Sequence, residues 1–407
     1  MRNSEFGMFV LCLRSSFQTD EFVRKEYAEL IRQLEIDCHA EIQIIGEENV
    51  ETFHGTSLRY VMVATGGVEG LFVRLLETRH ETSLKEVILI ADGRNNSLAA
   101  ALEILTYLEG RGVQGRIVHG TNDEIVGALH AGTLRGCRIG LFGKPSDWLI
   151  ASDVDREYLK ERFGIETIDI DLQRVIEGIK KVSQTEAVKV SQRVVKQAKG
   201  IKEPGCSDMV EAAKAYLAIK KICLEERLDA MTIRCFDIVK SCGTTSCLAL
   251  ALLNDEGIVA GCEGDMQTLM SLLLAKRVCG EEAFMANPSI LTDDTTMFAH
   301  CTIPLKMCDD ITLRSHFESS QGVAIQGVMP IKDYTIFKWG GTHLDRIFVA
   351  EAQAVETPYS EHFCRTQITL NINMKPYLLN HPIGNHHVII PGKHEREINS
   401  EFGINPC

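Results

Sequence analysis

Residue types that can bind a metal or move a proton gather in two regions of this 407-residue sequence. In the first, Glu263 and Asp265 follow an apolar, strand-like run at 257–261. Ligands of open α/β sheets bind beyond the carboxyl ends of the strands, so both carboxylates are candidates for a site. For Asp265, capping of the following helix is an equally good interpretation. Glu263 precedes that cap, and we expect its side chain to point into a cleft.

The second region is the last third of the chain, where His, Glu and Cys residues stand among apolar runs. Its polar groups are His300-Cys301-Thr302, His316-Phe317-Glu318-Ser319, Cys364-Arg365-Thr366-Gln367 and Asn385-His386-His387. A single strand histidine is more often a hydrogen-bonded core residue than a ligand. Four such groups favour a site, because a carboxylate with two or three neutral imidazoles suits Mn²⁺ or a similar divalent ion. We predict ligands from both regions.

Loops that follow the earlier strand-like runs give weaker evidence of a binding site. The segment 65–70 is glycine-rich but lacks the GxGxxG and GxxxxGK[ST] patterns of phosphate-binding loops. The loop 144–148 contains Trp148, whose simplest interpretation is an anchor at a domain interface. Because this loop follows a strand, where substrates bind, Trp148 stays among the candidate substrate-binding residues.

Three domains are predicted to position these residues. Strand-like and amphipathic runs alternate over 1–135 and again over 136–282, which indicates two open parallel-sheet α/β domains, the second carrying Glu263. In the second domain we expect one long polar helix over 172–199 and an apolar helix over 266–279. Segment 283–407 carries His300 and His386. It contains β-type runs split by Gly, Asp or Asn, at 298–303, 323–329, 334–338, 347–350, 367–372 and 387–390. Its length suits a small barrel or sandwich, so we expect a β-rich, barrel-like C-terminal domain.

Composition narrows the class of partner. Apolar residues make up 45% of the chain and charged residues 24%, as in ordinary soluble proteins. The chain has 43 Lys and Arg against 56 Asp and Glu, a net charge of −13, which argues against nucleic-acid or anionic-membrane partners. No apolar run has the length of a membrane span. The 14 cysteines include no CxxC pair, so we expect reduced thiols, a cytoplasmic location and a small-molecule partner.

The chain resembles the superfamily of L-fucose isomerase and L-arabinose isomerase, which are metal-dependent aldose–ketose isomerases. The matching segments span nearly the whole chain: Thr65-Gly66-Gly67, Asn95-Asn96-Ser97-Leu98-Ala99-Ala100, Gly261-Cys262-Glu263-Gly264-Asp265, Phe284-Met285-Ala286-Asn287, Ala299-His300-Cys301 and Gly384-Asn385-His386-His387. The resemblance implies two α/β domains and a β-rich domain. It also implies a homo-oligomer, a trimer or hexamer, with active sites at subunit interfaces.

Roles for particular residues follow from the same resemblance. It implies that Glu263 binds Mn²⁺ or another divalent metal and transfers a proton, and that His386 is a metal ligand. It also implies that Asn385 contacts the substrate, and that His300 matches a further ligand of the arabinose-type members.

Asn287 departs from the pattern of the family, which has an acidic ligand at this position. An Asn side chain can offer a carbonyl oxygen to a metal, but it cannot exchange a proton at neutral pH. We keep Asn287 as a candidate metal ligand and catalytic residue. His316 and Glu318 are candidates to replace the missing charge or to bind substrate.

The most favoured function is isomerisation of a monosaccharide or sugar derivative through an enediol, including deoxy and sulfonated sugars. Arg234, Arg365 or Lys144 could hold an anionic substituent. Because Asn287 leaves one carboxylate, a lyase or epimerase that uses the same metal cleft is an alternative. A non-catalytic sugar-binding relative is another.

Overall fold

The structure is a computed structural model that describes residues 9–38, 40–50, 58–78, 86–131, 134 and 136–401. Contacts within the chain divide it into two compact units, Met1–Gly132 and Thr133–Cys407. We describe each unit by itself.

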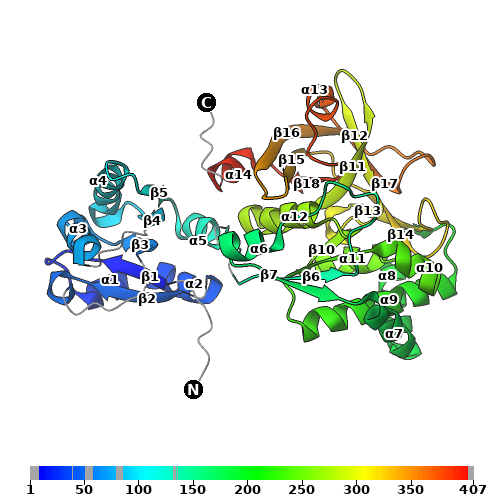
Figure 1. Cartoon of the computed structure of the whole chain (residues 1–407), viewed down its shortest axis with the longest axis horizontal. Helices are drawn as coiled ribbons and strands as arrows, with labels where there is room; N and C mark the ends of the chain where they lie inside the picture. The colour runs from blue at the N-terminus through cyan, green and yellow to red at the C-terminus, as the bar shows by residue number, and fades with distance from the viewer. Residues whose placement is uncertain are drawn as a thin grey trace. The chain divides into compact units, whose positions relative to one another are not determined.

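The first unit is an open α/β layer structure around a five-stranded parallel sheet with the order β2-β1-β3-β4-β5. Successive residues of β1 face opposite sides of the sheet, as the pleat requires. Leu11 belongs to one apolar core and Cys12 to the other, and helices cover both faces (Figure 1). The elements are β1 (Phe9–Leu13), α1 (Asp20–Glu26), α2 (Ala28–Asp37), β2 (Glu41–Ile45), β3 (Tyr60–Val63), α3 (Glu69–Thr78), β4 (Glu86–Ile90), α4 (Ser97–Glu109), β5 (Gln114–Val118) and α5 (Asn122–Ala131).

The second unit begins with a four-stranded parallel sheet of order β10-β9-β6-β7. Its strands and helices are β6 (Arg138–Phe142), α6 (Arg156–Tyr158), β7 (Glu166–Ile170), α7 (Leu172–Lys181), α8 (Gln184–Gln197), α9 (Cys206–Glu225), β9 (Ala230–Ile233), α10 (Cys235–Cys242), α11 (Cys247–Asp255), β10 (Val259–Cys262) and α12 (Met266–Cys279). The polar stretch predicted as one helix over 172–199 is two helices, because Val182 and Ser183 have extended backbones between them.

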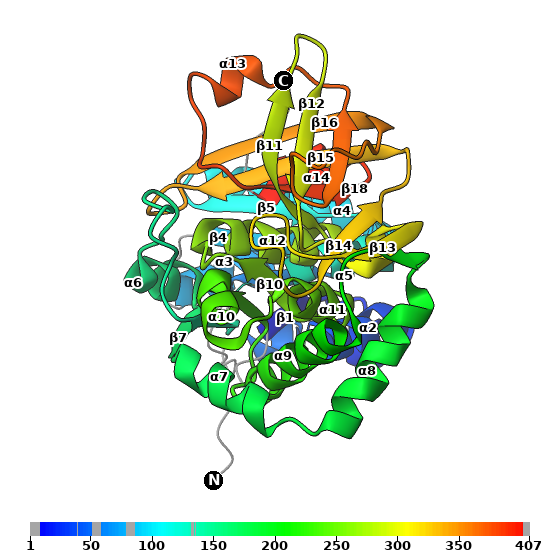
Figure 2. The same cartoon turned by 90° about the vertical axis from the view of Figure 1, so that its right-hand side faces the viewer.

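A closed barrel follows, with the strand order β11-β12-β17-β16-β15-β18 and antiparallel pairing throughout. A separate sheet of order β14-β13-β8 lies beside it (Figure 2). The elements are β8 (Gly200–Ile201), β11 (Phe284–Leu291), β12 (Thr296–His300), β13 (Asp310–Arg314), β14 (Ala324–Val328), β15 (Asp333–Gly340), β16 (Arg346–Glu356), β17 (Thr366–Leu370), α13 (Lys375–Leu378), β18 (His387–Pro391) and α14 (Glu395–Glu401). The predicted fold class, parallel α/β regions followed by a β-barrel, is confirmed.

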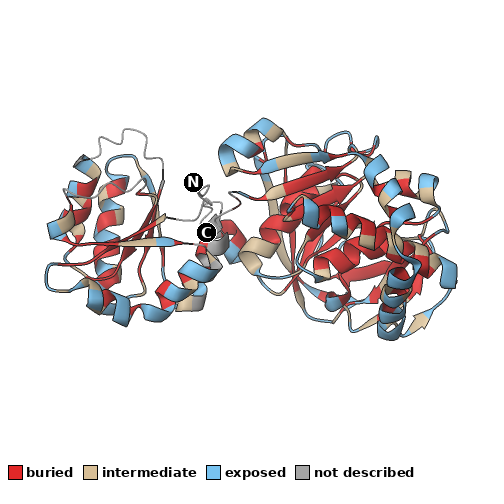
Figure 3. Ribbon diagram, turned by 90° about the horizontal axis from the view of Figure 1, so that it is seen from below, coloured by how far each residue is buried: buried red, intermediate tan, exposed pale blue. Residues whose placement is uncertain are grey.

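Helix α12 joins the parallel sheet to the barrel. It contacts β9 and β10 on the sheet and β11, β15 and β18 on the barrel, and every residue from Met266 to Ala275 is buried. A helix that is buried on all sides is a core element rather than a surface helix. One apolar core therefore runs from Leu141 in the sheet to Trp339 in the barrel, as the continuous buried region in Figure 3 illustrates. The boundary predicted near residue 282 stays a prediction, since the contacts separate the chain only between the two units.

Among the helices of the described residues, none combines the length and the apolar character needed to cross a membrane.

Candidate metal centre

Glu263 occupies an unusual backbone conformation directly after β10. Its φ is 64° and that of Gly264 is 74°, so two consecutive residues are left-handed. Such a conformation is uncommon for a residue with a side chain, and such residues cluster at functional sites. A Cβ at position 264 would lie 2.7 Å from Cα of Pro145, so the close approach of the 144–148 loop requires glycine here. The Ser146 amide donates to the Glu263 carbonyl at 2.9 Å and holds the turn.

The histidines come from one end of the barrel. His300 is the last residue of β12, and His386 immediately precedes β18. Strand β11 lies between these two strands: its Ala286 pairs with His387, and its Asn287 pairs with Ala299. This register brings both histidines to the end that faces the turn after β10.

Glu263, His300 and His386 form the one cluster of three potential metal-ligating side chains found among the described residues, with ligand atoms within 4.8 Å of one another. Glu263 Oε1 lies 3.8 Å from Nε2 of His300 and 3.6 Å from Nε2 of His386. Two ligands of one ion, each bound at roughly 2.1 Å, lie at most roughly 4.2 Å apart, so both distances fit a shared ion. In addition, Nε2 of His386 is buried without a hydrogen-bond partner. The donor set therefore fits a divalent cation.

Trp148 holds the second oxygen of the carboxylate. Its indole Nε1 donates to Glu263 Oε2 at 2.7 Å. The Trp148 side chain is 52% exposed, and its ring packs edge-on against Phe236 at 5.1 Å, while Phe236 packs in the same way against His316 at 5.5 Å. These ring contacts connect Trp148, which donates to Glu263, with His316. Trp148 thus contacts the site residue directly.

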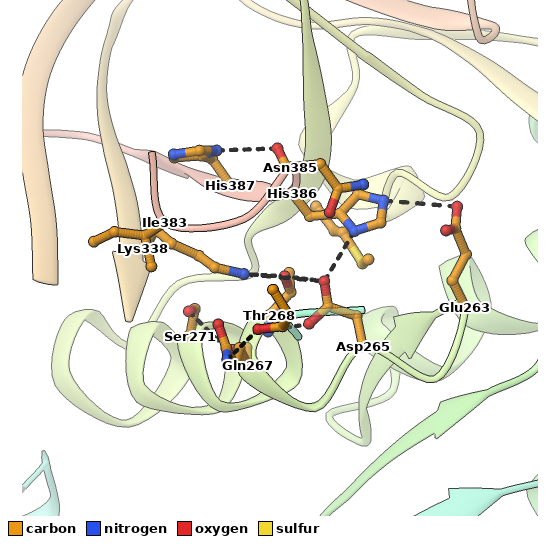
Figure 4. A network of polar contacts seen from close by, with 12 residues as sticks. Glu263, Asp265, Gln267, Thr268, Ser271, Lys338, Ile383, Asn385, His386 and His387 are labelled. Atoms are coloured by element: carbon orange, nitrogen blue, oxygen red, sulfur yellow. Dashed lines mark hydrogen bonds and ion pairs between the residues drawn. The ribbon is translucent and has the colours of Figure 1, made fainter. Parts of the chain in front are cut away.

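Asp265 combines the two roles that the sequence left open. Its Oδ1 accepts the Thr268 amide at 2.8 Å and caps α12, while its Oδ2 lies 2.9 Å from Nδ1 of His386 (Figure 4). A carboxylate at Nδ1 of a ligating histidine orients the ring and fixes which nitrogen bears the proton. The helix cap is therefore also a partner of the site.

A buried lysine stands next to this carboxylate. Lys338 on β15 has no exposed surface; its Nζ donates to Thr268 Oγ1 at 2.7 Å and lies 3.9 Å from Asp265 Oδ2. Burial lowers the pKa of Lys338, and the charge of Asp265 opposes this shift. The sequence reasoning missed Lys338, although a lysine inside the apolar run Tyr334–Trp339 was an available signal of a buried charge.

The charges at the centre shift the pKa of Glu263, Asp265 and His386. Burial by itself would raise the pKa of Glu263, but His300 and His386 hold it well below its usual range. Asp265 is also buried, yet Lys338 and His386 lower its pKa to about 2. For His386, burial is outweighed by Asp265 and Glu263, which raise the pKa to about 9. Both carboxylates are thus ionised at neutral pH.

Asn287 and Asn385 contact each other at the same end of the barrel. The Asn385 amide donates to Asn287 Oδ1 at 3.1 Å, with Asn287 half-buried and Asn385 exposed. Asn385 immediately precedes His386 in the sequence, so this pair of amides lies next to a histidine of the cluster. A ligand role for Asn287 stays a prediction, as does substrate contact by Asn385.

The remaining sequence candidates for the site are His316, Glu318 and Arg365. His316 is buried, which lowers its pKa, and Glu318 is exposed on the following turn. Arg365 is buried and donates to the Ser315 carbonyl and to Glu361, each at 2.9 Å. A substrate role for these three residues stays a prediction.

Comparison with known proteins finds remote relatives that carry the same name, sulfoquinovose isomerase. No family model matches the chain. The chain is 24% identical over 259 residues to sulfoquinovose isomerase of Priestia aryabhattai, which is 61% of this chain and 58% of that protein. It is 23% identical over 229 residues to sulfoquinovose isomerase of Clostridium sp. (strain MSTE9), covering 53% of this chain and 50% of that protein. The chain therefore spans less than two thirds of the relatives it matches.

Proposed function

We propose that this protein is a metal-dependent aldose–ketose isomerase that acts on a sulfonated monosaccharide. The observation that carries the proposal is the Glu263 carboxylate facing two histidines, one of which has a buried and unpartnered Nε2. The relatives named sulfoquinovose isomerase support both the reaction class and the sulfonated substrate. The site residues Glu263, His300 and His386 would hold Mn²⁺ or a similar divalent cation.

Isomerisation of an aldose moves a proton from C2 to C1 through an enediol. A bound divalent cation would supply positive charge that favours the negatively charged state between aldose and ketose. The carboxylate of Glu263 can divide its roles, since Oε1 faces the histidines and Oε2 faces Trp148. Because a carboxylate oxygen can accept more than one hydrogen bond, Oε2 keeps accepting capacity for the proton while the Trp148 indole holds it in place. One base that carries the proton across one face of the enediol suffices for the transfer from C2 to C1, while the O2 hydroxyl proton passes to O1.

A direct assay tests the proposal. Purified protein with Mn²⁺ is incubated separately with 6-deoxy-6-sulfoglucose, glucose, L-fucose and L-arabinose, and ketose formation is followed by NMR in D₂O. We expect ketose from the sulfonated sugar, with deuterium at C1 where the transferred proton exchanges with solvent. Mn²⁺ binding without turnover of any of these sugars would contradict this assignment and favour a lyase, an epimerase or a sugar-binding protein.

Lys144 is the best placed of the three cations considered for the sulfonate. Arg234 is engaged by Asp147 at 2.6 Å and by Asp237 at 2.9 Å, and Arg365 is engaged by Glu361. Lys144 is exposed, and its backbone carbonyl packs against Gly264, the neighbour of Glu263. We propose that its ammonium faces the anionic group.

We expect Lys144→Met to raise the KM for the sulfonated sugar by roughly tenfold, because a charge-assisted contact is worth about 1.5–3 kcal/mol when desolvated and less when exposed. The kcat should change little, since the role proposed for Lys144 is at the sulfonate and not at the reacting carbons. Lys181→Met, which alters an exposed lysine on α7, is the matched control. An unchanged KM for the sulfonated sugar would rule out this role for Lys144.

A further inference from the structure

A continuous series of buried polar contacts runs from the barrel to the back of His386 (Figure 4). Lys338 donates to Thr268 Oγ1 at 2.7 Å, and Thr268 Oγ1 donates to Asp265 Oδ2 at 2.7 Å. The same Oδ2 lies 2.9 Å from Nδ1 of His386, whose Nε2 faces Glu263. Lys338, Thr268, Asp265 and His386 each have 0% exposed surface, so no solvent competes for these contacts.

The direction of every hydrogen bond in this series follows from its two charged members. An ammonium can only donate, so the Thr268 hydroxyl accepts from Lys338 and turns its own hydrogen toward Asp265. A carboxylate can only accept, so Nδ1 of His386 must be the donor in the next contact. When the imidazole is neutral, the lone pair is therefore on Nε2, the atom without a hydrogen-bond partner.

We propose that Asp265, Thr268 and Lys338 are positioning residues that keep Nδ1 of His386 protonated and present its Nε2 to a divalent cation. This inference rests on the metal site of the proposed function and assigns that site its supporting shell. Partners of this kind orient the ligating ring and raise its basicity, and their loss typically weakens metal binding by about 10- to 100-fold.

Helix capping alone does not account for the arrangement. Asp265 Oδ1 already caps α12 by accepting the Thr268 amide, as Asp171 does for α7 with the Gln173 amide. The Asp171 cap is exposed and has no lysine partner in the described contacts, so a cap does not require one. Burying an ammonium costs free energy unless it is paired and hydrogen-bonded. The Lys338 ammonium and the Thr268 hydroxyl stabilise the negative charge on Asp265 Oδ2, the oxygen that faces His386.

The experiment measures Mn²⁺ affinity by isothermal titration calorimetry, with thermal unfolding of the metal-free protein alongside. Asp265→Asn keeps the shape and the helix cap, because Asn caps helices as well as Asp does. With the Asn oxygen kept at the cap, its NH₂ group faces Nδ1 of His386, so a neutral imidazole must carry its lone pair on Nδ1 rather than on Nε2. Thr268→Val interrupts the series at constant shape, Thr268→Ser restores the hydroxyl, and Lys338→Met removes the donor. Asp171→Asn is the control cap.

We expect Asp265→Asn to weaken Mn²⁺ binding by about 10- to 100-fold. Thr268→Val and Lys338→Met should weaken it by a smaller factor, while Thr268→Ser and Asp171→Asn should bind as the unaltered chain does. Folded Asp265→Asn and Thr268→Val proteins with unchanged Mn²⁺ affinity would overturn the inference, whatever their melting temperatures. If Lys338→Met does not fold, the Thr268→Val and Thr268→Ser pair still decides the question.

The outcome is separable from that of the proposed reaction. Mn²⁺ affinity that depends on Asp265 in a protein without isomerase activity would support the positioning role and overturn the reaction. Isomerase activity together with affinity that is indifferent to Asp265 would do the reverse. An unaltered chain that binds no Mn²⁺ would overturn both.

Discussion

Glu263→Gln is expected to lower kcat for the sulfonated sugar by about 10²- to 10⁴-fold, the usual contribution of a general base. Gln has nearly the same shape and still accepts the Trp148 indole, but it cannot take up a proton at neutral pH. It also removes the negative charge that faces His300 and His386. We therefore expect weaker Mn²⁺ binding together with the loss of turnover, measured by calorimetry and by the NMR assay.

Glu177→Gln provides the control for this substitution, because Glu177 is an exposed glutamate on α7 whose partners, Gln173 at 3.4 Å and Lys181 at 3.9 Å, lie on the same helix. It should leave kcat and Mn²⁺ affinity unchanged. If Glu263→Gln kept full turnover, Glu263 could not be the base. If the unaltered chain bound the sugar without turnover and Glu263→Gln bound it equally well, the protein would be a sugar-binding relative rather than an isomerase.

Removal of divalent metal is expected to abolish turnover, and Mn²⁺ is expected to restore it. The same ion should stabilise the fold, because a ligand that binds only the native state at 100 times its dissociation constant adds about 2.7 kcal/mol to the free energy of unfolding. Dialysis against EDTA followed by titration with Mn²⁺, with activity and melting temperature recorded at each step, measures both effects.

Histidine variants test which side chains bind the metal. His386→Gln and His300→Gln should abolish the rise in melting temperature on addition of Mn²⁺, because each removes one imidazole of the cluster. His343→Gln is the control, since His343 is well exposed and its partner is Asp155, outside the cluster. Full activity after chelation, or an Mn²⁺ response that persists without His386, would contradict this ligand set.

Elements with a strong local pattern were predicted correctly from the sequence. Helix α12 was expected over 266–279 and has those bounds, because a long apolar run begins at the cap Asp265 and ends at Gly280, which has a positive φ. The barrel strands β15 and β18 also match their apolar runs closely. Where the spacing of apolar residues agrees with the residues that start and stop an element, the local sequence is enough to predict its bounds.

Strands with a weak local pattern were missed. In β7 the apolar residues follow neither the helical period of about 3.6 residues nor a clear strand period of two. The strand lies at the edge of its sheet, where burial alternates incompletely. In β11 an Asn-Pro pair interrupts the run, and the register shifts between Pro288 and Ile290. A proline cannot donate a hydrogen bond to a neighbouring strand, so its presence in a sequence indicates a loop rather than a strand. Only the pairing with β12 and β18 identifies this segment as a strand.

The residue types alone indicated the chemistry of the candidate site: a carboxylate after a strand, histidines among barrel strands, and a helix cap beside them. They did not indicate which groups meet. The register of β11, β12 and β18 puts His300 and His386 at one end of the barrel, and packing of α12 against β15 sets Lys338 beside Asp265. These contacts join segments far apart in the chain. Local preference says nothing about such contacts, because they depend on how strands pair and how a buried helix packs.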